Sequence, residues 1–387
     1  MLNPKLPISY GRQDINEADI QAVVNTLKAD YLTGGPRIGE FEKKFADYIG
    51  APYAVACSSG TAALHLCTLA LGVKKGDKVI TTPNTFVASA NCVLYQGGEI
   101  DLVDIDPATK LMDLNALEKK LASSPKGTYQ GIIPVDFAGH PIKMDQVRAL
   151  ADQHGCWVIE DSCHAPGGYY TDANGQVQQC GNGHFADLAI FSFHPVKHIA
   201  TGEGGMVTTS RKELYDKMIQ LRSHGITRDR SLLQEDHGGW YYEMQSLGYN
   251  YRLSDIAASL GISQLEREAQ RVARRREIAA TYDLELKDLP IDLPQNIEGH
   301  AYHLYVIETE KRDELYSYLR SQQIYPQIHY IPIHYQPYYK KLGWRKGDLS
   351  HAEAYYDRCL SIPLFPTLES DQLAYVVEKI RTFLLKN

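Results

Sequence analysis

The strongest constraint on the fold is a regular alternation of short apolar runs with helical stretches between about residues 15 and 255. Runs such as IIPV and WVI are continuously apolar, which is typical of strands buried on both faces of a sheet. This alternation predicts an α/β fold with a mainly parallel sheet covered by helices. The predicted strands are 54–56, 78–82, 99–103, 131–135 and 157–160.

Three stretches in the same region have helical periodicity. Residues 14–28 predict a capped amphipathic helix whose apolar side carries Ile15, Ile20, Val23, Val24 and Leu27. Within 31–50, a Gly/Pro turn precedes a helix that places Phe41, Phe45 and Ile49 in line, and 61–71 is a further helix that ends at a glycine.

The pattern changes near residue 255. Residues 260–278 predict one long charged helix, and the remainder combines short helices with β-rich pieces such as 301–307 and loops rich in Tyr, Pro and His. A chain of 387 residues favours two domains. We therefore predict a large α/β domain over residues 1–264 and a smaller α+β domain over residues 265–387.

Charge and composition exclude several classes of protein. The formal net charge of −7 argues against a nucleic-acid binder, so the basic cluster at 271–277 is interpreted as a solvated helix face. No run reaches the ~18 apolar residues of a membrane span, and the N-terminus lacks the apolar core of a signal peptide. Seven scattered cysteines indicate reduced thiols, a cytoplasmic location and no metal site.

The stretch 190-IFSFHPVKHIATGEGGMVTT-209 places Lys197 between two β-rich runs, with a glycine cluster behind it. A nucleophilic lysine must be partly desolvated so that its amine can be neutral, and glycines let the backbone pass close to a ligand. Taken alone, such a lysine is more often a solvated surface residue.

The run 157-WVIEDSCHA-165 ends in Glu160 and Asp161. Adjacent residues of a strand point to opposite faces, so one carboxylate faces a possible site while the other faces a helix or solvent. Ligands of open α/β sheets bind beyond the carboxyl ends of strands, where an acid suits a cofactor with a protonated ring nitrogen. The alternative is an acid that caps the next helix.

Two further motifs carry weaker signals. In 58-SSGTAALHL-66, Ser59, Gly60 and Thr61 precede a helix whose unpaired N–H groups would bind a phosphate, although, taken alone, the motif is better explained as an ordinary N-cap. In 82-TPNTFVASAN-91, Phe86 could stack on a planar ring or belong to the core.

Together these motifs supply a phosphate cradle, a stacking aromatic, an acid and a Schiff-base lysine, which are the contacts of pyridoxal 5′-phosphate (PLP). The sequence resembles the fold-type I, aspartate aminotransferase-like PLP enzymes, and among them the sugar aminotransferases of the DegT/DnrJ/EryC1/StrS family. The resemblance covers essentially the whole chain. Its marks are SSGTAAL, TPNTFVAS, VIEDSCHA, FADLAIFSFHPVKHIATGEGG, LGYNYRLSD and IHYIPIH.

The resemblance implies a role for each of these residues. Lys197 would form the Schiff base and carry the proton, and Asp161 would pair with the ring nitrogen. His164 stands where many members have glutamine near the ring hydroxyl. Asn250 would reach the cofactor phosphate of a neighbouring subunit, which implies a homodimer with shared sites. The remaining cofactor contacts would come from Ser59, Gly60, Thr61, Phe86 and Ser192.

Family members transfer an amino group, usually from L-glutamate, to a nucleotide-linked keto-sugar. The segments 222–229 and 238–255 look most like the branch that makes UDP-4-amino-4,6-dideoxy-N-acetyl-β-L-altrosamine, a precursor of pseudaminic acid. The alternatives are another keto-sugar, amination at C3, or a catalytically silent protein of the same fold. In the branch that makes this pseudaminic acid precursor, the residues that line the substrate site would be Tyr10, Asp30, Tyr31, Leu32, Thr33, Gln327, Ile328, His329 and Tyr330.

Overall fold

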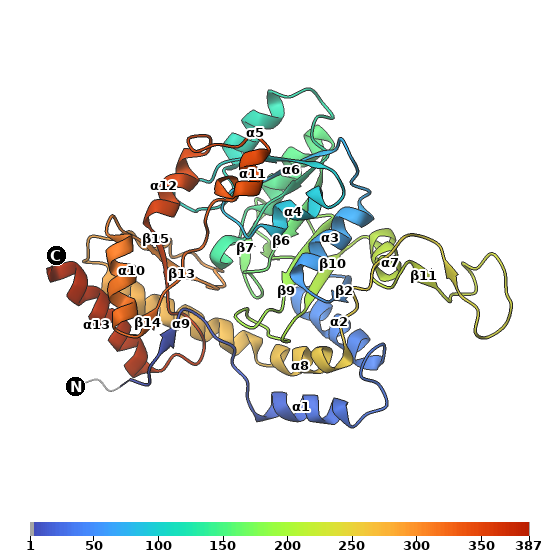
Figure 1. The fold of residues 1–387 in the computed structure, drawn as a ribbon, viewed down its shortest axis with the longest axis horizontal. Coiled ribbons are helices and arrows are strands. Elements are labelled where there is room, and N and C mark those ends of the chain that lie inside the picture. The colour runs from blue at the N-terminus through green and yellow to red at the C-terminus, as the bar shows by residue number, and fades with distance from the viewer. Residues whose placement is uncertain (1–3, 387) are drawn as a thin grey trace.

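The computed structural model describes residues 4–386 and is shown in Figure 1. Its helices are α1 (Glu17–Leu27), α2 (Pro36–Ile49), α3 (Gly60–Ala70), α4 (Ala88–Leu94), α5 (Leu114–Ala122), α6 (Met144–His154), α7 (Lys212–Leu221), α8 (Asp255–Leu265), α9 (Glu268–Leu286), α10 (Arg312–Ser321), α11 (Pro337–Lys341), α12 (Ser350–Arg358) and α13 (Ser370–Lys386), with 3-10 turns at η1 (Phe137–Gly139) and η2 (Ile333–Tyr335). Its strands are β1 (Ile8–Ser9), β2 (Tyr53–Cys57), β3 (Lys78–Thr81), β4 (Glu99–Leu102), β5 (Gly131–Ile133), β6 (Trp157–Asp161), β7 (Tyr169–Thr171), β8 (Val177–Gln179), β9 (Leu188–Ser192), β10 (Gly205–Thr209), β11 (Ile226–Thr227), β12 (Glu243–Met244), β13 (Tyr305–Glu308), β14 (Ile324–Tyr325) and β15 (Cys359–Ile362).

A seven-stranded sheet forms the centre of the molecule, in the order β2-β10-β9-β6-β5-β3-β4. Only β10 runs against its neighbours β2 and β9, so the predicted mainly parallel sheet is confirmed. Because β2, β3, β6 and β9 share a direction, their carboxyl ends meet at one edge of the sheet. The helix predicted within 31–50 is α2, and its Phe41, Phe45 and Ile49 are fully buried.

The C-terminal part has a core of its own. Strands β13 and β15 pair antiparallel, and α9, α10 and α13 pack around them. The N-terminal strand β1 joins this part by pairing with β14, which buries Ile8 there. Ile8 therefore lies in the core of the C-terminal part, and the boundary at 264/265 stays a prediction.

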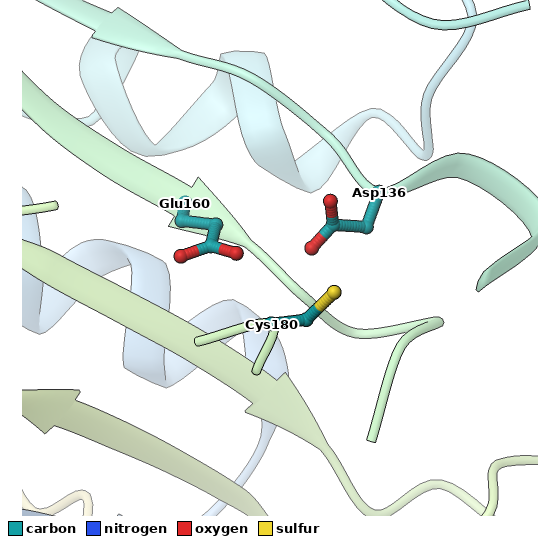
Figure 2. Close-up of side chains that lie close together, drawn as sticks. All are labelled: Asp136, Glu160 and Cys180. Carbon is teal, nitrogen blue, oxygen red and sulfur yellow. The ribbon is translucent and has the colours of Figure 1, made fainter. Parts of the chain in front are cut away.

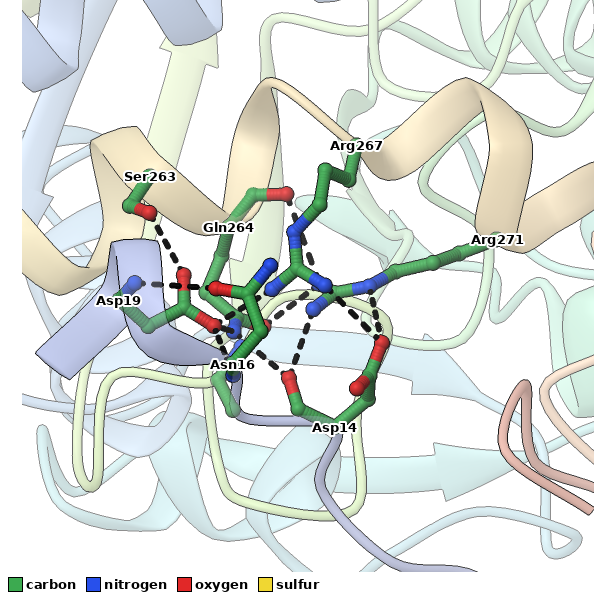
Figure 3. Close-up of polar contacts among 8 residues, drawn as sticks. Asp14, Asn16, Asp19, Ser263, Gln264, Arg267 and Arg271 are labelled. Atoms are coloured by element: carbon green, nitrogen blue, oxygen red, sulfur yellow. Dashed lines mark hydrogen bonds and ion pairs between the residues drawn. The ribbon is translucent and has the colours of Figure 1, made fainter.

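The prediction of one long helix over 260–278 is wrong. The structure has two helices, α8 and α9, which separate at Glu266 and Arg267. Arg267 leaves helical geometry, with ψ near 2°, and its guanidinium pairs with Asp14 and Asp19 of the N-terminal segment. Figure 3 shows this cluster, in which Asp19 also accepts hydrogen bonds from Ser263 and Gln264.

The interpretation of the basic cluster at 271–277 as a solvated face is also wrong for two arginines. Arg271 is 4% exposed and bonds Asp14 and Gln264. Arg275 is 2% exposed and donates to the carbonyls of Tyr302 and Leu364. Both guanidiniums are buried because chain segments distant in the sequence bring oxygen acceptors to them.

The N-terminal helix α1 is capped as predicted, by a capping box between Asn16 and Asp19. Its orientation is the reverse of a usual amphipathic helix, because Asp19 and Thr26 are buried against α8. The apolar residues Ile15, Ile20 and Leu27 are instead 44–55% exposed. Much of the apolar face of α1 is therefore left uncovered by the described part of the chain, residues 4–386.

A hairpin arm, residues 226–247, extends away from the body of the protein (Figure 1). It is built on the short strands β11 and β12 and exposes Trp240, Met244 and Leu247. Within residues 4–386, helices long and apolar enough to cross a membrane are absent. All seven cysteines are free, as expected for reduced thiols.

Candidate active site

A cavity of about 350 Å³ opens where the carboxyl ends of β2, β3, β6 and β9 meet. The loops after these strands and two segments of the C-terminal part form its wall. The predicted residues that line it are Tyr10, Ser59, Gly60, Thr61, Phe86, Asp161, His164, Ser192, Lys197, His329 and Tyr330.

Lys197 lies in the turn that follows β9, where its backbone N–H donates to the carbonyl of His194 at 2.8 Å. Burial lowers the pKa of Lys197, and the nearby Cys163 and Asp161 oppose this shift. A lysine with a lowered pKa has a larger fraction of neutral, nucleophilic amine. The environment thus supports the covalent role expected for this residue.

Asp161 ends β6 and faces the cavity. Its Oδ1 accepts from the backbone N–H of Cys163 at 3.2 Å, and its Oδ2 accepts from the Ser89 hydroxyl at 2.7 Å. Both donors stabilise the ionised carboxylate. Asp161 is therefore a buried acceptor, 5% exposed, that presents negative charge to the cavity.

The neighbouring Glu160 does not line this cavity, so the two carboxylates point apart as the strand geometry predicts. Figure 2 shows Glu160 beside Asp136 and Cys180, which together form the one described group of potential metal ligands within residues 4–386. Burial raises the pKa of Asp136 to about 6 and that of Glu160 well above its usual value. Because Ile142, Ser162 and Gly181 donate to these carboxyl groups, we interpret the cluster as a buried acid pair.

The phosphate cradle predicted at 59–61 lies at the N-terminus of α3. Ser59 caps this helix by accepting from the N–H of Ala62, which leaves the N–H groups of Gly60 and Thr61 without intrahelical partners. A Cβ on Gly60 would lie 2.9 Å from the Cβ of Ser192, so only glycine lets these two segments approach. The N–H groups and the hydroxyls of Thr61 and Ser192 make this corner suitable for a phosphate.

Phe86 stands at the mouth of the cavity and is 58% exposed. This exposure argues against the alternative that Phe86 belongs to the core. An exposed ring at a cavity mouth can cover one face of a planar ligand.

His164 is held in one tautomer. Its Nδ1 accepts from the N–H of Ala138 at 3.2 Å, so its Nε2 carries the proton and donates to the hydroxyl of Tyr330 at 3.1 Å. Burial and the charge of Lys197 push the pKa of His164 well below its usual value. A neutral His164 is therefore a fixed hydrogen-bond donor.

Sequence reasoning missed several residues of this wall. Thr85 bonds to Ser89, which bonds to Asp161, and Cys163 lines the cavity. The ring centroids of His303 and His164 lie 4.3 Å apart, with the rings tilted. The serine and threonine belong to the motif TPNTFVAS, from which only the aromatic was selected. His303 lies well after α9 in the sequence, and no local sequence pattern distinguishes it from other histidines.

Other predicted residues lie outside this cavity. Asn250 is exposed and bridges to Ser223 in the base of the hairpin arm. Asp30, Tyr31, Leu32 and Thr33 are exposed beyond α1, and Gln327 pairs with the backbone of Ser361. Ile328 packs on the hydrophobic core. These residues do not contact the cavity of their own chain.

Comparison with known proteins agrees with this geometry. A family model described as the DegT/DnrJ/EryC1/StrS aminotransferase family matches residues 13–381. The UDP-4-amino-4,6-dideoxy-N-acetyl-beta-L-altrosamine transaminase of Campylobacter jejuni is 37% identical over 98% of this chain and 98% of its own. The spore coat polysaccharide biosynthesis protein SpsC of Bacillus subtilis is 37% identical over 97% of this chain and 96% of its own. The structure of Helicobacter pylori PseC, an aminotransferase of pseudaminic acid biosynthesis, superposes with a TM-score of 0.89 at 29% identity, covering 99% of this chain and 100% of PseC.

Proposed function

Because this chain belongs to the DegT/DnrJ/EryC1/StrS aminotransferase family, whose members are PLP-dependent sugar aminotransferases, we propose that it aminates C4 of a UDP-linked keto-sugar with L-glutamate as donor. The observation that carries the mechanism is that Lys197, Asp161 and the glycine-lined corner at Gly60 face one cavity. A buried acid, a lysine of lowered pKa and a cradle that a Cβ would fill fit PLP.

The protein groups have distinct tasks in this proposal. PLP, when bound, supplies a ring that accepts electrons from the breaking C–H bond. Asp161 holds the ring nitrogen protonated, and Gly60, Thr61 and Ser192 bind the phosphate. Phe86 and His164 orient the ring. Lys197 would hold PLP covalently through its Nζ, and the same Nζ would then move a proton between the substrate carbon and the cofactor.

The site is proposed to be completed by a second copy of this chain. Among the described residues that line the cavity, Lys197 is the one lysine or arginine, yet a nucleotide diphosphate and glutamate both need cationic partners. The hairpin arm carries Arg228 and Arg230, and the Arg230 side chain is 74% exposed. The exposed apolar face of α1 supplies a surface for a symmetric dimer. We therefore propose a homodimer in which Asn250 and the arm reach the partner's cavity.

The proposed sugar is UDP-2-acetamido-2,6-dideoxy-β-L-arabino-hexos-4-ulose, which would give the 4-amino-altrosamine product. Support comes from the name of the Campylobacter jejuni relative, from PseC, and from the aromatic and polar wall at Tyr10, His329 and Tyr330. The wall suits a sugar ring, because it presents aromatic side chains together with hydroxyl and imidazole groups. The second candidate is amination of another nucleotide-linked sugar, at C4 or C3, and it is favoured by the different name of SpsC.

The test is a product assay with purified protein, glutamate and a panel of UDP- and dTDP-linked 4-keto sugars. We expect one C4 epimer from the UDP-linked L-arabino ketone, identified by NMR, because Lys197 delivers its proton from one face. A C3 amine, or a clear kinetic preference for a dTDP-linked or D-xylo ketone, would establish the second candidate.

A further inference from the structure

A chain of two buried hydroxyls leads to Asp161 from the start of α4. The Ser89 hydroxyl lies 2.7 Å from Oδ2 of Asp161, and the Thr85 hydroxyl lies 2.8 Å from that of Ser89. Ser89 is fully buried and Thr85 is 2% exposed. Buried hydroxyls bond in defined directions because bulk water does not compete for them.

The direction of each proton follows from the chemistry of the groups. An ionised carboxylate only accepts hydrogen bonds, so Ser89 donates its single proton to Asp161. The Ser89 oxygen then remains an acceptor, and Thr85 donates to it. The order of donation is Thr85 to Ser89 to Asp161.

The two linked hydroxyls of Thr85 and Ser89 fix one side of the Asp161 carboxylate. The backbone N–H of Cys163 holds Oδ1 and Ser89 holds Oδ2, so rotation of the carboxylate plane would break both bonds. The lone pairs that remain face the cavity that Asp161 lines. We propose that Ser89 and Thr85 are positioning residues that keep Asp161 ionised and aimed at the cofactor's ring nitrogen.

The inference rests on the proposed role of Asp161, and it predicts effects on cofactor binding as well as on turnover. Without the Ser89 hydroxyl, Asp161 loses a charge-assisted donor in a buried site. We expect Ser89→Ala to weaken PLP binding about 10- to 100-fold. The visible absorbance of the bound cofactor should also titrate at a different pH, because the ring nitrogen shares its proton with a less stable carboxylate.

Thr85 provides a matched pair of variants. Thr85→Val removes the hydroxyl and keeps the volume, whereas Thr85→Ser keeps the hydroxyl and removes a methyl group. We expect Thr85→Val to shift the absorbance titration in the same sense as Ser89→Ala, by a smaller amount, and Thr85→Ser to behave as wild type. Thr81→Val is the control, because this buried hydroxyl donates to the carbonyl of Ile133 and does not contact Asp161.

The experiment titrates apo-protein with PLP and records the absorbance of each holo-protein against pH, together with kcat and KM. The inference is wrong if the absorbance of Thr85→Val and Ser89→Ala titrates at the same pH as that of wild type. It is also wrong if Thr81→Val shows the same shift as these two variants. Should Ser89→Ala not fold, the Thr85 pair decides. Failure of the proposed function is distinguishable, because wild type would then bind no PLP or Asp161→Asn would leave the spectrum unchanged.

Discussion

Asp161 lies in a wall whose buried histidines are neutral. Burial lowers the pKa of His329 to about 3, and the pKa values of His164 and His303 lie well below their usual range. The nearby charge of Lys197 contributes to each of these shifts. The buried wall therefore combines one lysine and one aspartate with neutral histidines, as the proposed PLP site requires.

We expect Asp161→Asn to lower aminotransfer turnover about 10²- to 10⁴-fold while the protein stays folded, because an amide cannot hold the ring nitrogen protonated. Turnover and thermal unfolding are measured on the same preparations. Glu160→Gln is the matched control, since this adjacent carboxyl lies outside the cavity. Near-normal turnover of the Asp161 variant would remove this residue from the mechanism.

The acid pair of Asp136 and Glu160 gives a pH dependence of stability. The folded-state pKa of Asp136 is about 6 and that of Glu160 is raised well above 4.5, so the folded state binds more protons than the unfolded chain. The contribution of this pair to stability is then greatest below about pH 4 and falls as the pH rises through about 6, by at most about 1.4 kcal/mol per pH unit for each group.

Glu160→Gln removes one of these titrations, and its amide oxygen can still accept from Gly181. We expect the free energy of unfolding of this variant to fall less between pH 4.5 and 7 than that of wild type, measured by denaturant unfolding of the apo-protein. The exposed Glu118→Gln serves as control. Equal slopes for all three proteins would show that the pair does not titrate in this range.

At the scale of elements, we expect two adjacent residues of α1 to have different roles. Asp19 contributes to the stability of the fold, and Ile20 contributes to assembly of the dimer. Asp19 is fully buried and accepts from Ser263, Gln264 and Arg267. Asp19→Ala leaves the two buried side-chain donors of Ser263 and Gln264 without an acceptor and removes the capping box of α1, so it should cost about 3–5 kcal/mol of stability. Ile20 is 48% exposed on the opposite side. We expect Ile20→Asp to leave the protein folded and to weaken the dimer, as read by denaturant unfolding and sedimentation velocity. A folded Ile20→Asp protein that stays fully dimeric would remove the apolar face of α1 from the interface.

The central strands could be predicted from sequence because burial on both faces leaves continuous apolar runs. The break between α8 and α9 could not, since helical periodicity continues through Arg267 and the partners of its guanidinium lie some 250 residues away. The burial of Arg271 and Arg275 could not be predicted either, because acceptors from distant segments bind their guanidiniums. The orientation of α1 also escaped prediction, because periodicity identifies an apolar face without showing which face the rest of the chain covers.

The candidate site also contains residues that the sequence predicts and residues that it does not. Lys197, Asp161 and Gly60 could be identified because strand ends and a helix start make local patterns. Thr85, Ser89 and His303 could not, because their role depends on distances between segments that only the folded chain brings together. Asn250 and residues 30–33 lie outside the cavity of their own chain, so their predicted roles depend on assembly at the scale of the whole molecule.

Assembly can be tested by complementation. Asn250→Ala should be weak and Lys197→Ala inactive when each is purified alone, because every site would lack one essential residue. In a mixed dimer, one site combines the intact lysine of one chain with the intact asparagine of the other, so part of the activity should return. Mixing Lys197→Ala with Asp161→Asn is the matched control: both residues line the cavity of one chain, so each mixed site stays defective. If heterodimers of the first pair form and remain as inactive as the parents, Asn250 does not cross between subunits.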